Sequence, residues 1–203
     1  MKAKDRFEQR YVSGDLPWNV GRPDFNLTEI VESGFVKKCK TLEIGCGTGD
    51  NSIWLAKKEF EVTACDVSMT AIQKAREKAS SVEGNCNFHI IDFMKESIPD
   101  LPFEFVFDRG CLHSFDKRRK QKIFSKKVAF HLINGGLWLS LIGNPDSGPR
   151  TPGPPQHSAK KIISVVEPFF EILSLKSSHF DSDQPVPARA WVCLMRKRVR
   201  ITG

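Results

Sequence analysis

The sequence has no apolar run approaching the roughly 20 residues that a membrane-spanning helix needs. Its first eleven residues, MKAKDRFEQRY, contain no apolar core of the kind found in secretory signal peptides. We therefore expect a cytoplasmic protein that does not associate with membranes. Hydrophobic residues make up 40% of the 203 positions, which is enough for one globular domain with a sizeable core.

The pattern of cysteines lacks the features of a zinc site. The six cysteines include no CxxC pair, and no cluster of histidines accompanies them. Structural zinc sites need closely spaced ligands, so we expect no bound metal. Most of these cysteines lie in or beside apolar runs, which indicates reduced and mostly buried thiols in a reducing compartment.

Acidic residues are fewer than basic ones, with 24 against 31, and the net charge is +7. Part of the excess lies in KRRKQK at 117–122 and RKRVR at 196–200. Such clusters could contact phosphates. Because no aromatic residues alternate with the charges as in a nucleic-acid module, we interpret them as a solvated helix face and a tail.

Apolar runs alternate with helical segments along most of the chain. Alternation of this kind predicts an α/β fold with a mostly parallel sheet and helices on both of its faces. The expected strands are 41–46, 61–67, 87–93, 103–110, 137–143, 170–180 and 188–198. The expected helices are 50–59, 68–80, 120–133 (ending at the Asn-Gly-Gly of 134–136) and 158–169. The proline-rich segment 144–156 predicts an irregular, functional loop.

The stretch TLEIGCGTGDN, residues 41–51, places a glycine-rich loop between the first strand and its helix. A dinucleotide-binding loop has the spacing GxGxxG, whereas here the third glycine comes one residue early and Asp50 takes its place. A carboxylate at a helix N-terminus would repel a pyrophosphate. No GK[ST] follows, so a Walker A loop is excluded as well. The loop allows close approach of a ligand without being built for phosphate.

Three acidic residues describe the ligand further. Asp66 ends the second strand, where a carboxylate can accept hydrogen bonds from both ribose hydroxyls. Asp92 ends the third strand and could accept from an adenine amine, or could be a surface residue at a strand end. Glu43 lies inside a buried strand, where an acid is costly unless it is paired or functional. Together they predict a ligand with a ribose, an adenine and positive charge, such as S-adenosylmethionine.

At this point the chain resembles the class I S-adenosylmethionine-dependent methyltransferases. The resemblance rests on LEIGCGTGDNSIWLA at 42–56, on Asp66 and Asp92, and on LINGGLWLS at 132–140. It implies a Rossmann-like sheet of seven mostly parallel strands, with the last strand antiparallel. The alternative is an α/β domain that binds no nucleotide.

Two further segments, DLPWNVGRPDF at 15–25 and FDRGCLHSF at 107–115, resemble the branch of thiopurine, thiol and halide methyltransferases and tellurite-resistance methyltransferases. This resemblance implies a helical lid segment at 1–35 that folds over the methyltransferase domain at 36–203. Trp18 would then be a lid aromatic that faces the sulfonium. Arg22 would anchor a substrate anion or an acid of the main domain. The alternative is a plain amphipathic turn that packs on the core.

Carried over residue by residue, the resemblance implies a set of cofactor contacts and a reacting group at the end of the fourth strand. The cofactor contacts would be Trp18, Arg22, Glu43, Gly45, Cys46, Gly47, Gly49, Asp66, Val67, Asp92, Phe93 and Asp108. The catalytic candidates are Asp108, Arg109 and His113.

Each catalytic candidate also has a structural interpretation. Asp108 could be a structural acid, Arg109 the ion-pair partner of such an acid, and His113 a capping or partly buried histidine. We expect Cys111 to be a packed small residue rather than a nucleophile, because methyl transfer from a sulfonium needs no covalent enzyme intermediate. Close to the proline-rich loop, we expect His157 to be a surface histidine.

We expect direct in-line displacement at the methyl carbon, with S-adenosylhomocysteine as the product. A thiol, a selenium or tellurium species, or a halide is already nucleophilic and needs little general base. A hydroxyl or amine acceptor would need one, and His113 or Asp108 would be the candidates. The positive charge leaves open an RNA or protein methyltransferase, and a catalytically silent S-adenosylmethionine-binding protein is a further alternative. We expect a monomer or weak dimer.

Overall fold

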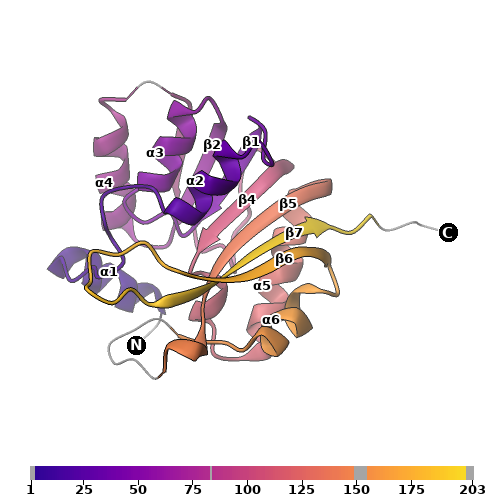
Figure 1. Ribbon diagram of the computed structural model, residues 1–203. Coiled ribbons are helices and arrows are strands. Elements are labelled where there is room, and N and C mark those ends of the chain that lie inside the picture. The colour runs from indigo at the N-terminus through magenta and orange to yellow at the C-terminus, as the bar shows by residue number, and fades with distance from the viewer. Residues whose placement is uncertain (1–2, 83, 149–154, 200–203) are drawn as a thin grey trace.

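The computed structural model describes residues 3–82, 84–148 and 155–199 (Figure 1). Seven strands form one sheet in the order β3-β2-β1-β4-β5-β7-β6. Strands β1 to β5 run parallel to one another, and β7 is antiparallel to both β5 and β6. The strands are β1 (Lys40–Ile44), β2 (Glu61–Asp66), β3 (Cys86–Ile90), β4 (Phe103–Arg109), β5 (Leu132–Gly143), β6 (Phe170–His179) and β7 (Arg189–Lys197). This confirms the predicted fold class.

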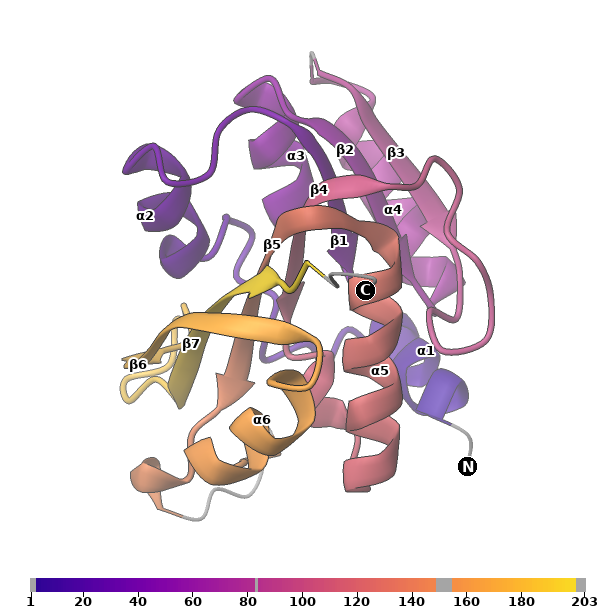
Figure 2. The same cartoon turned by 90° about the vertical axis from the view of Figure 1, so that its right-hand side faces the viewer.

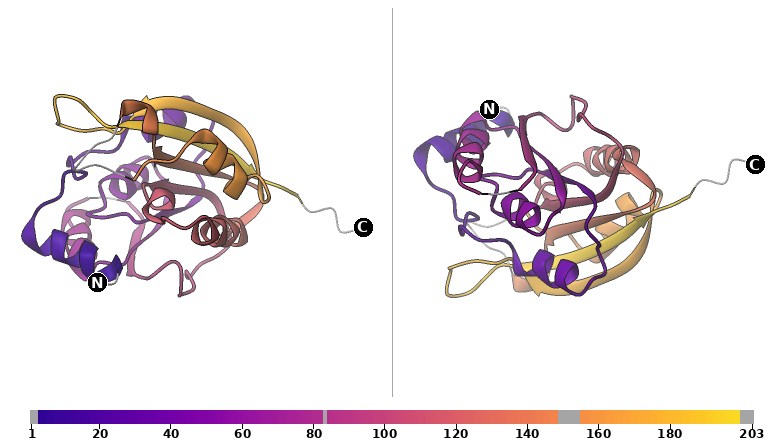
Figure 3. Two further views of the ribbon diagram at one scale, coloured as in Figure 1. Left: turned by 90° about the horizontal axis from the view of Figure 1, so that it is seen from below. Right: turned by 90° about the horizontal axis from the view of Figure 1, so that it is seen from above.

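Helices cover both faces of the sheet (Figures 2 and 3). They are α1 (Ala3–Ser13), α2 (Phe25–Glu32), α3 (Asp50–Lys57), α4 (Met69–Ala79), α5 (Arg118–His131) and α6 (Ala159–Val166), with the short 3₁₀ turns η1 (Leu112–Ser114) and η2 (Pro145–Ser147). Apolar residues of α2, α3 and α4 share one core with the sheet, and those of α5 and α6 share the other. Strand β4 contributes side chains to both cores, because Phe105 and Phe107 point to the first and Val106 to the second.

The start of β5 corrects one expectation. The Asn-Gly-Gly of 134–136 was expected to end the preceding helix, yet α5 ends at His131 and β5 begins at once. Leu132 pairs with Phe103 and Leu137 with Phe105, so the register shifts between these pairs and the two glycines lie in a strand irregularity. Burial of Leu132 against β4 fixes where the strand begins.

Two smaller differences concern loops. Strand β3 ends at Ile90, so Asp92 lies two residues beyond the strand. Within the proline-rich segment, the turn η2 begins after Asn144, whose side chain accepts a hydrogen bond from the Asp146 N–H. Residues 149–154 of the expected loop lie outside the described residues.

A substitution at Gly49 tests how tightly the start of α3 is packed. Gly49 has φ 83°, and a Cβ there would lie 2.9 Å from two ring carbons of Phe88. We expect Gly49→Ala to lower the free energy of unfolding in urea by about 1–3 kcal/mol. Gly14→Ala is the matched control, because Gly14 has φ 76° but open space around it. Equal losses for the two variants would contradict a packing role for Gly49.

Candidate active site at the carboxyl edge of the sheet

The glycine loop leaves the carboxyl end of β1 and turns sharply into α3. The backbone N–H groups of Gly45 and Cys46 both donate to the Cys65 carbonyl oxygen, at 2.7 and 3.0 Å, which joins the loop to β2. Gly45 and Gly47 have φ 71° and 55°, so the loop needs glycine at these positions. The Gly47 N–H donates to the Asp66 carboxylate at 3.0 Å. The loop and Asp66 therefore form one unit.

Two buried carboxylates lie beside this loop. Glu43 accepts hydrogen bonds from the Asn51 amide at 2.9 Å and from the Ser52 hydroxyl, and its burial raises its pKa to about 7. Asp66 accepts from the Gly47 and Ser68 backbone N–H groups, and burial raises the pKa of Asp66 as well. Neither forms an ion pair with a basic side chain among the residues that the structure describes.

This arrangement fits a cationic ligand that carries hydroxyl groups. Each Asp66 oxygen accepts one backbone N–H and keeps a further lone pair for a hydroxyl donor. A positive charge near Glu43 would offset the cost of burying its carboxylate. S-adenosylmethionine combines a ribose diol with sulfonium and ammonium charges, so the residues present fit it.

Helix α1 covers the loop through Tyr11, a residue that the sequence analysis did not single out. The Tyr11 side chain is buried, and a Cβ at Gly47 would lie 2.6 Å from its hydroxyl oxygen. The Trp18 indole N–H donates to the same hydroxyl at 3.3 Å. Tyr11 is the single tyrosine of the chain, and it lies in the mostly polar α1. Its spacing of four residues from Phe7, which places both rings on one side of the helix, was the available signal.

The Trp18 ring already contacts a cationic side chain, that of Arg10. The Arg10 guanidinium carbon lies 4.5 Å from the centroid of the Trp18 ring. One ring face is therefore engaged in a cation–π contact within the lid segment itself. The expected contact between Trp18 and a sulfonium stays a prediction.

Arg109 connects three separated parts of the chain. Its Nε donates to the Asp24 carboxylate at 2.7 Å, and its two terminal nitrogens donate to the backbone oxygens of Trp18 and Asp181, at 3.0 and 2.6 Å. Asp24 is fully buried and also caps α2. The sequence analysis allowed an ion-pair role for Arg109, and the partner is Asp24 rather than the neighbouring Asp108.

Arg22 binds an acid of the main domain, which was one of its two expected roles. It forms ion pairs with Asp181 at 2.6 Å and with Asp183 at 2.7 Å, in the segment between β6 and β7. These ion pairs and the hydrogen bonds of Arg109 connect the residues before α2 to the segment between β6 and β7.

Asp108 has the environment of a structural carboxylate. Its side chain is fully buried and accepts hydrogen bonds from the backbone N–H groups of Cys111 and Leu112 and from the Trp138 indole N–H, at 2.9–3.1 Å. Burial raises its pKa to about 6. These donors hold the turn after β4, so the geometry favours the structural interpretation over contact with a ligand or acceptor.

His113 is held as a neutral imidazole. Its Nδ1 accepts the Gly143 backbone N–H at 2.9 Å, which places its ring proton on Nε2. Burial lowers its pKa to about 3. Neither ring nitrogen is therefore free to take a proton, and the structure does not support a general-base role.

Three other residues, Asp92, Phe93 and Val67, were also expected to contact the cofactor. Asp92 accepts from the Met94 N–H at 3.1 Å and from Lys95 at 2.6 Å, so it caps a turn and forms an ion pair. Phe93 packs in the second core against Phe124 and His131 rather than lining the surface. Val67 is half-buried beside Asp66.

The side chains of Cys46, Cys111 and His157 are largely enclosed by other parts of the protein. The Cys46 thiol is buried, and the Cys111 thiol donates to the Ile44 carbonyl oxygen at 3.1 Å. Burial raises the pKa of both thiols well above the usual value. His157 is buried against Gln121 rather than exposed, which corrects the surface interpretation. In the described part of the chain, no group of three His, Cys, Asp or Glu residues could hold a metal.

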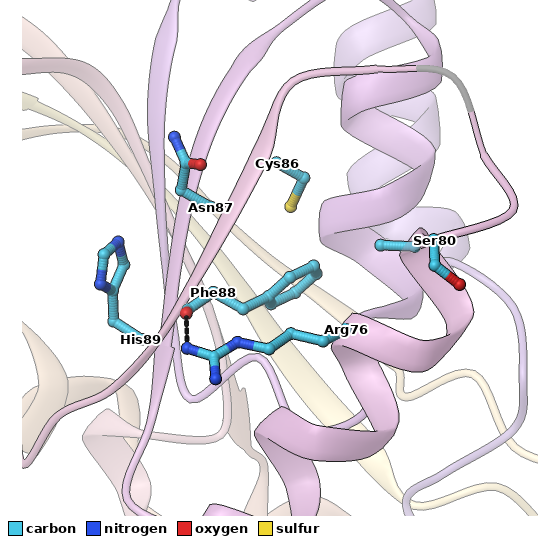
Figure 4. A pocket seen from close by; sticks show the side chains of 7 residues that line it. Arg76, Ser80, Cys86, Asn87, Phe88 and His89 are labelled. Atoms are coloured by element: carbon cyan, nitrogen blue, oxygen red, sulfur yellow. Dashed lines mark hydrogen bonds between the residues drawn. The ribbon is translucent and has the colours of Figure 1, made fainter.

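A separate hollow of about 400 Å³ lies at the β3 edge of the sheet (Figure 4). Its lining includes Arg76, Phe88 and His89, and the Arg76 guanidinium donates to the Phe88 carbonyl oxygen at 2.6 Å. None of the expected site residues lines it. The hollow is therefore distinct from the glycine-loop site.

Known methyltransferases are similar to this chain in sequence. Residues 41–136 match the model of a methyltransferase domain family. A probable thiol methyltransferase from Arabidopsis thaliana is 26% identical over 175 residues, covering 83% of this chain and 75% of that protein.

Two solved structures have the same fold. A protein studied in the conversion of a disulfide bond into a thioacetal group during echinomycin biosynthesis superposes with a TM-score of 0.86 at 21% identity, covering 99% of this chain and 94% of that one. Magnesium protoporphyrin IX methyltransferase from Synechocystis, solved with bound S-adenosylmethionine, gives 0.74 at 14% identity, covering 97% and 98%.

The ion pair of Arg109 gives a testable prediction about stability. Arg109→Met removes the charge that compensates the buried Asp24 carboxylate, so we expect a loss of about 3–5 kcal/mol in the free energy of unfolding. Arg22→Met breaks exposed ion pairs and should cost about 1 kcal/mol or less. Urea denaturation of both variants measures the difference. A loss below that of Arg22→Met would contradict the central position of Arg109.

Proposed function

We propose that the chain is a class I S-adenosylmethionine-dependent methyltransferase that methylates a small soft nucleophile: a thiol, a selenium or tellurium species, or a halide. The thiol methyltransferase among its relatives supports this acceptor class. So does the sulfur chemistry named for the protein of the echinomycin pathway, whose fold this chain shares.

The observation that carries the proposal is the state of the titratable groups at the end of β4. Asp108 is enclosed by donors, and His113 has its Nδ1 lone pair engaged. Asp24 is paired with Arg109, and the Cys111 thiol donates to a carbonyl. None of these described groups is free to take a proton from an acceptor. A hydroxyl or ammonium acceptor would need such a base, whereas a thiolate or halide needs none.

The cofactor supplies an electrophilic methyl group on its sulfonium, and the protein binds and orients it. We assign the ribose hydroxyls to the free lone pairs of Asp66, and the cationic methionine end to Glu43. The glycine loop lets the ligand lie against the backbone. Holding acceptor and methyl carbon in line can supply roughly 7–11 kcal/mol of the barrier reduction.

Other residues around the glycine loop have positioning roles in this proposal. Asp108 holds the turn that carries Cys111 and His113, and Arg109 holds the lid segment over the loop. Tyr11 and Trp18 keep water from the glycine loop, and the Tyr11 side chain moves when the ribose binds Asp66. The proposal makes α1 part of the cofactor site.

The pH dependence of turnover distinguishes this mechanism from general-base catalysis. At saturating cofactor, we expect kcat/KM for thiol acceptors to rise with pH because the thiolate fraction rises, and to level off above the pKa of each thiol. The midpoint should shift with the acceptor when thiols of different acidity are compared, and a halide acceptor should show no such rise. One common midpoint for all acceptors would indicate an enzyme base and contradict the proposal.

The pKa of Glu43 predicts a pH dependence of cofactor binding. A cationic ligand favours the ionised carboxylate, so binding lowers a pKa of about 7 and releases a proton. Affinity for S-adenosylmethionine should therefore increase as pH rises through about 7 and stay constant above it. Glu43→Gln should abolish this dependence in calorimetric titrations. Equal affinity at pH values on both sides of the Glu43 pKa would contradict the assignment of Glu43 to the cationic end.

A further inference from the structure

Helix α5 has a concentration of positive charge that no ion pair offsets in the described part of the chain. Its fourteen residues, RRKQKIFSKKVAFH, include no acidic residue. Its basic residues are Arg118, Arg119, Lys120, Lys122, Lys126 and Lys127. None of the six forms an ion pair with an acid in the described part of the chain.

This charge is unfavourable for the isolated helix. Three basic residues lie in the first turn, at the positive end of the helix dipole, and Lys117 at the N-cap position makes no capping hydrogen bond through its side chain. Lys122 and Lys126 are like charges four residues apart, which destabilises a helix slightly. An anionic partner along the helix would remove both penalties.

Large apolar side chains lie among these charges. Ile123 is 44% exposed and Phe130 is 68% exposed, while Ile133, just beyond the helix, is 39% exposed. Residues 123, 126 and 130 are separated by three and four positions, so they project from the same side of the helix. The opposite side of α5 packs in the second core through Phe124 and Val128.

We propose that the outer surface of α5 binds the surface of an anionic lipid bilayer. This surface, the α5 face, consists of Arg119, Lys122, Ile123, Lys126, Phe130 and Ile133. The helix would lie parallel to the membrane, with its apolar side chains entering the boundary between headgroups and acyl chains. The basic side chains would contact the anionic headgroups while their stems cover apolar surface.

Charge and side-chain chemistry favour this occupant over others. A second copy of the chain would bring the same positive charges together. Single-stranded RNA stacks its bases on aromatic rings, but two of the three exposed apolar residues are isoleucines. No helix in the described residues is long and apolar enough to cross a membrane, and the α5 face requires contact with one leaflet only. The proposal replaces the expectation from composition that the protein does not associate with membranes.

Co-sedimentation of the full chain with vesicles tests the proposal. We expect binding to vesicles of phosphatidylcholine mixed with phosphatidylserine, little binding to phosphatidylcholine alone, and release by high salt. Lys122→Glu/Lys126→Glu should weaken binding by about tenfold or more. Phe130→Ser should weaken it several-fold without any change in charge.

The matched control is Lys37→Glu/Lys57→Glu, which makes the same change in net charge at two exposed positions near α2 and α3. It should bind within about twofold of the unmodified chain if the α5 face is the site. Equal weakening by the control would show that only net charge matters and would overturn the proposal.

Absence of binding to the mixed vesicles at physiological salt would also overturn the proposal. Binding of single-stranded RNA instead, lost in the α5 variants, would assign the face to nucleic acid. Methyl transfer in solution should be unchanged in all these variants, so this test is independent of the acceptor class.

Discussion

The ion pair between Arg109 and Asp24 joins the parts of the chain that surround the candidate site. Arg109 ends β4, Asp24 precedes α2, and the remaining guanidinium nitrogens donate to Trp18 and to Asp181. Asp24 also receives the Asp181 N–H and, through its own N–H, contacts Asn51, which in turn donates to Glu43. One polar network therefore connects the lid segment, the β6–β7 connection and the glycine loop.

The buried carboxylates at this edge have different roles because their partners differ. Asp108 is fully buried and accepts three hydrogen bonds, from its own turn and from Trp138, so it stabilises the fold. Asp24 is neutralised by Arg109. Glu43 and Asp66 have only neutral donors, so a cationic ligand can still improve their environment. The number and charge of partners therefore distinguish the two structural acids from the two that we propose bind the cofactor.

The sequence predicted the mostly parallel sheet and the position of the glycine loop, because these follow from local periodicity and from glycine spacing. The antiparallel direction of the last strand came from the family resemblance. It could not assign partners across long sequence distances. The pairing of Arg109 with Asp24, the burial of His157 and the tautomer of His113 all depend on tertiary contacts. Tyr11 was overlooked because two aromatic residues four positions apart in a mostly polar helix are not a motif. The extent of β5 was misjudged because tertiary pairing of Leu132 overrides the local preference of Asn-Gly-Gly for a turn.

We propose that this site transfers a methyl group without removing a proton from the acceptor. The most direct measurement compares thiophenol and phenol as competing acceptors with labelled S-adenosylmethionine at neutral pH, since the two share one ring and differ in the reacting atom. We expect label to enter thiophenol, which is largely ionised at this pH, and not phenol, which keeps its proton. Transfer to phenol at a comparable rate would contradict the proposal, because such transfer requires a base that the residues at the end of β4 do not provide.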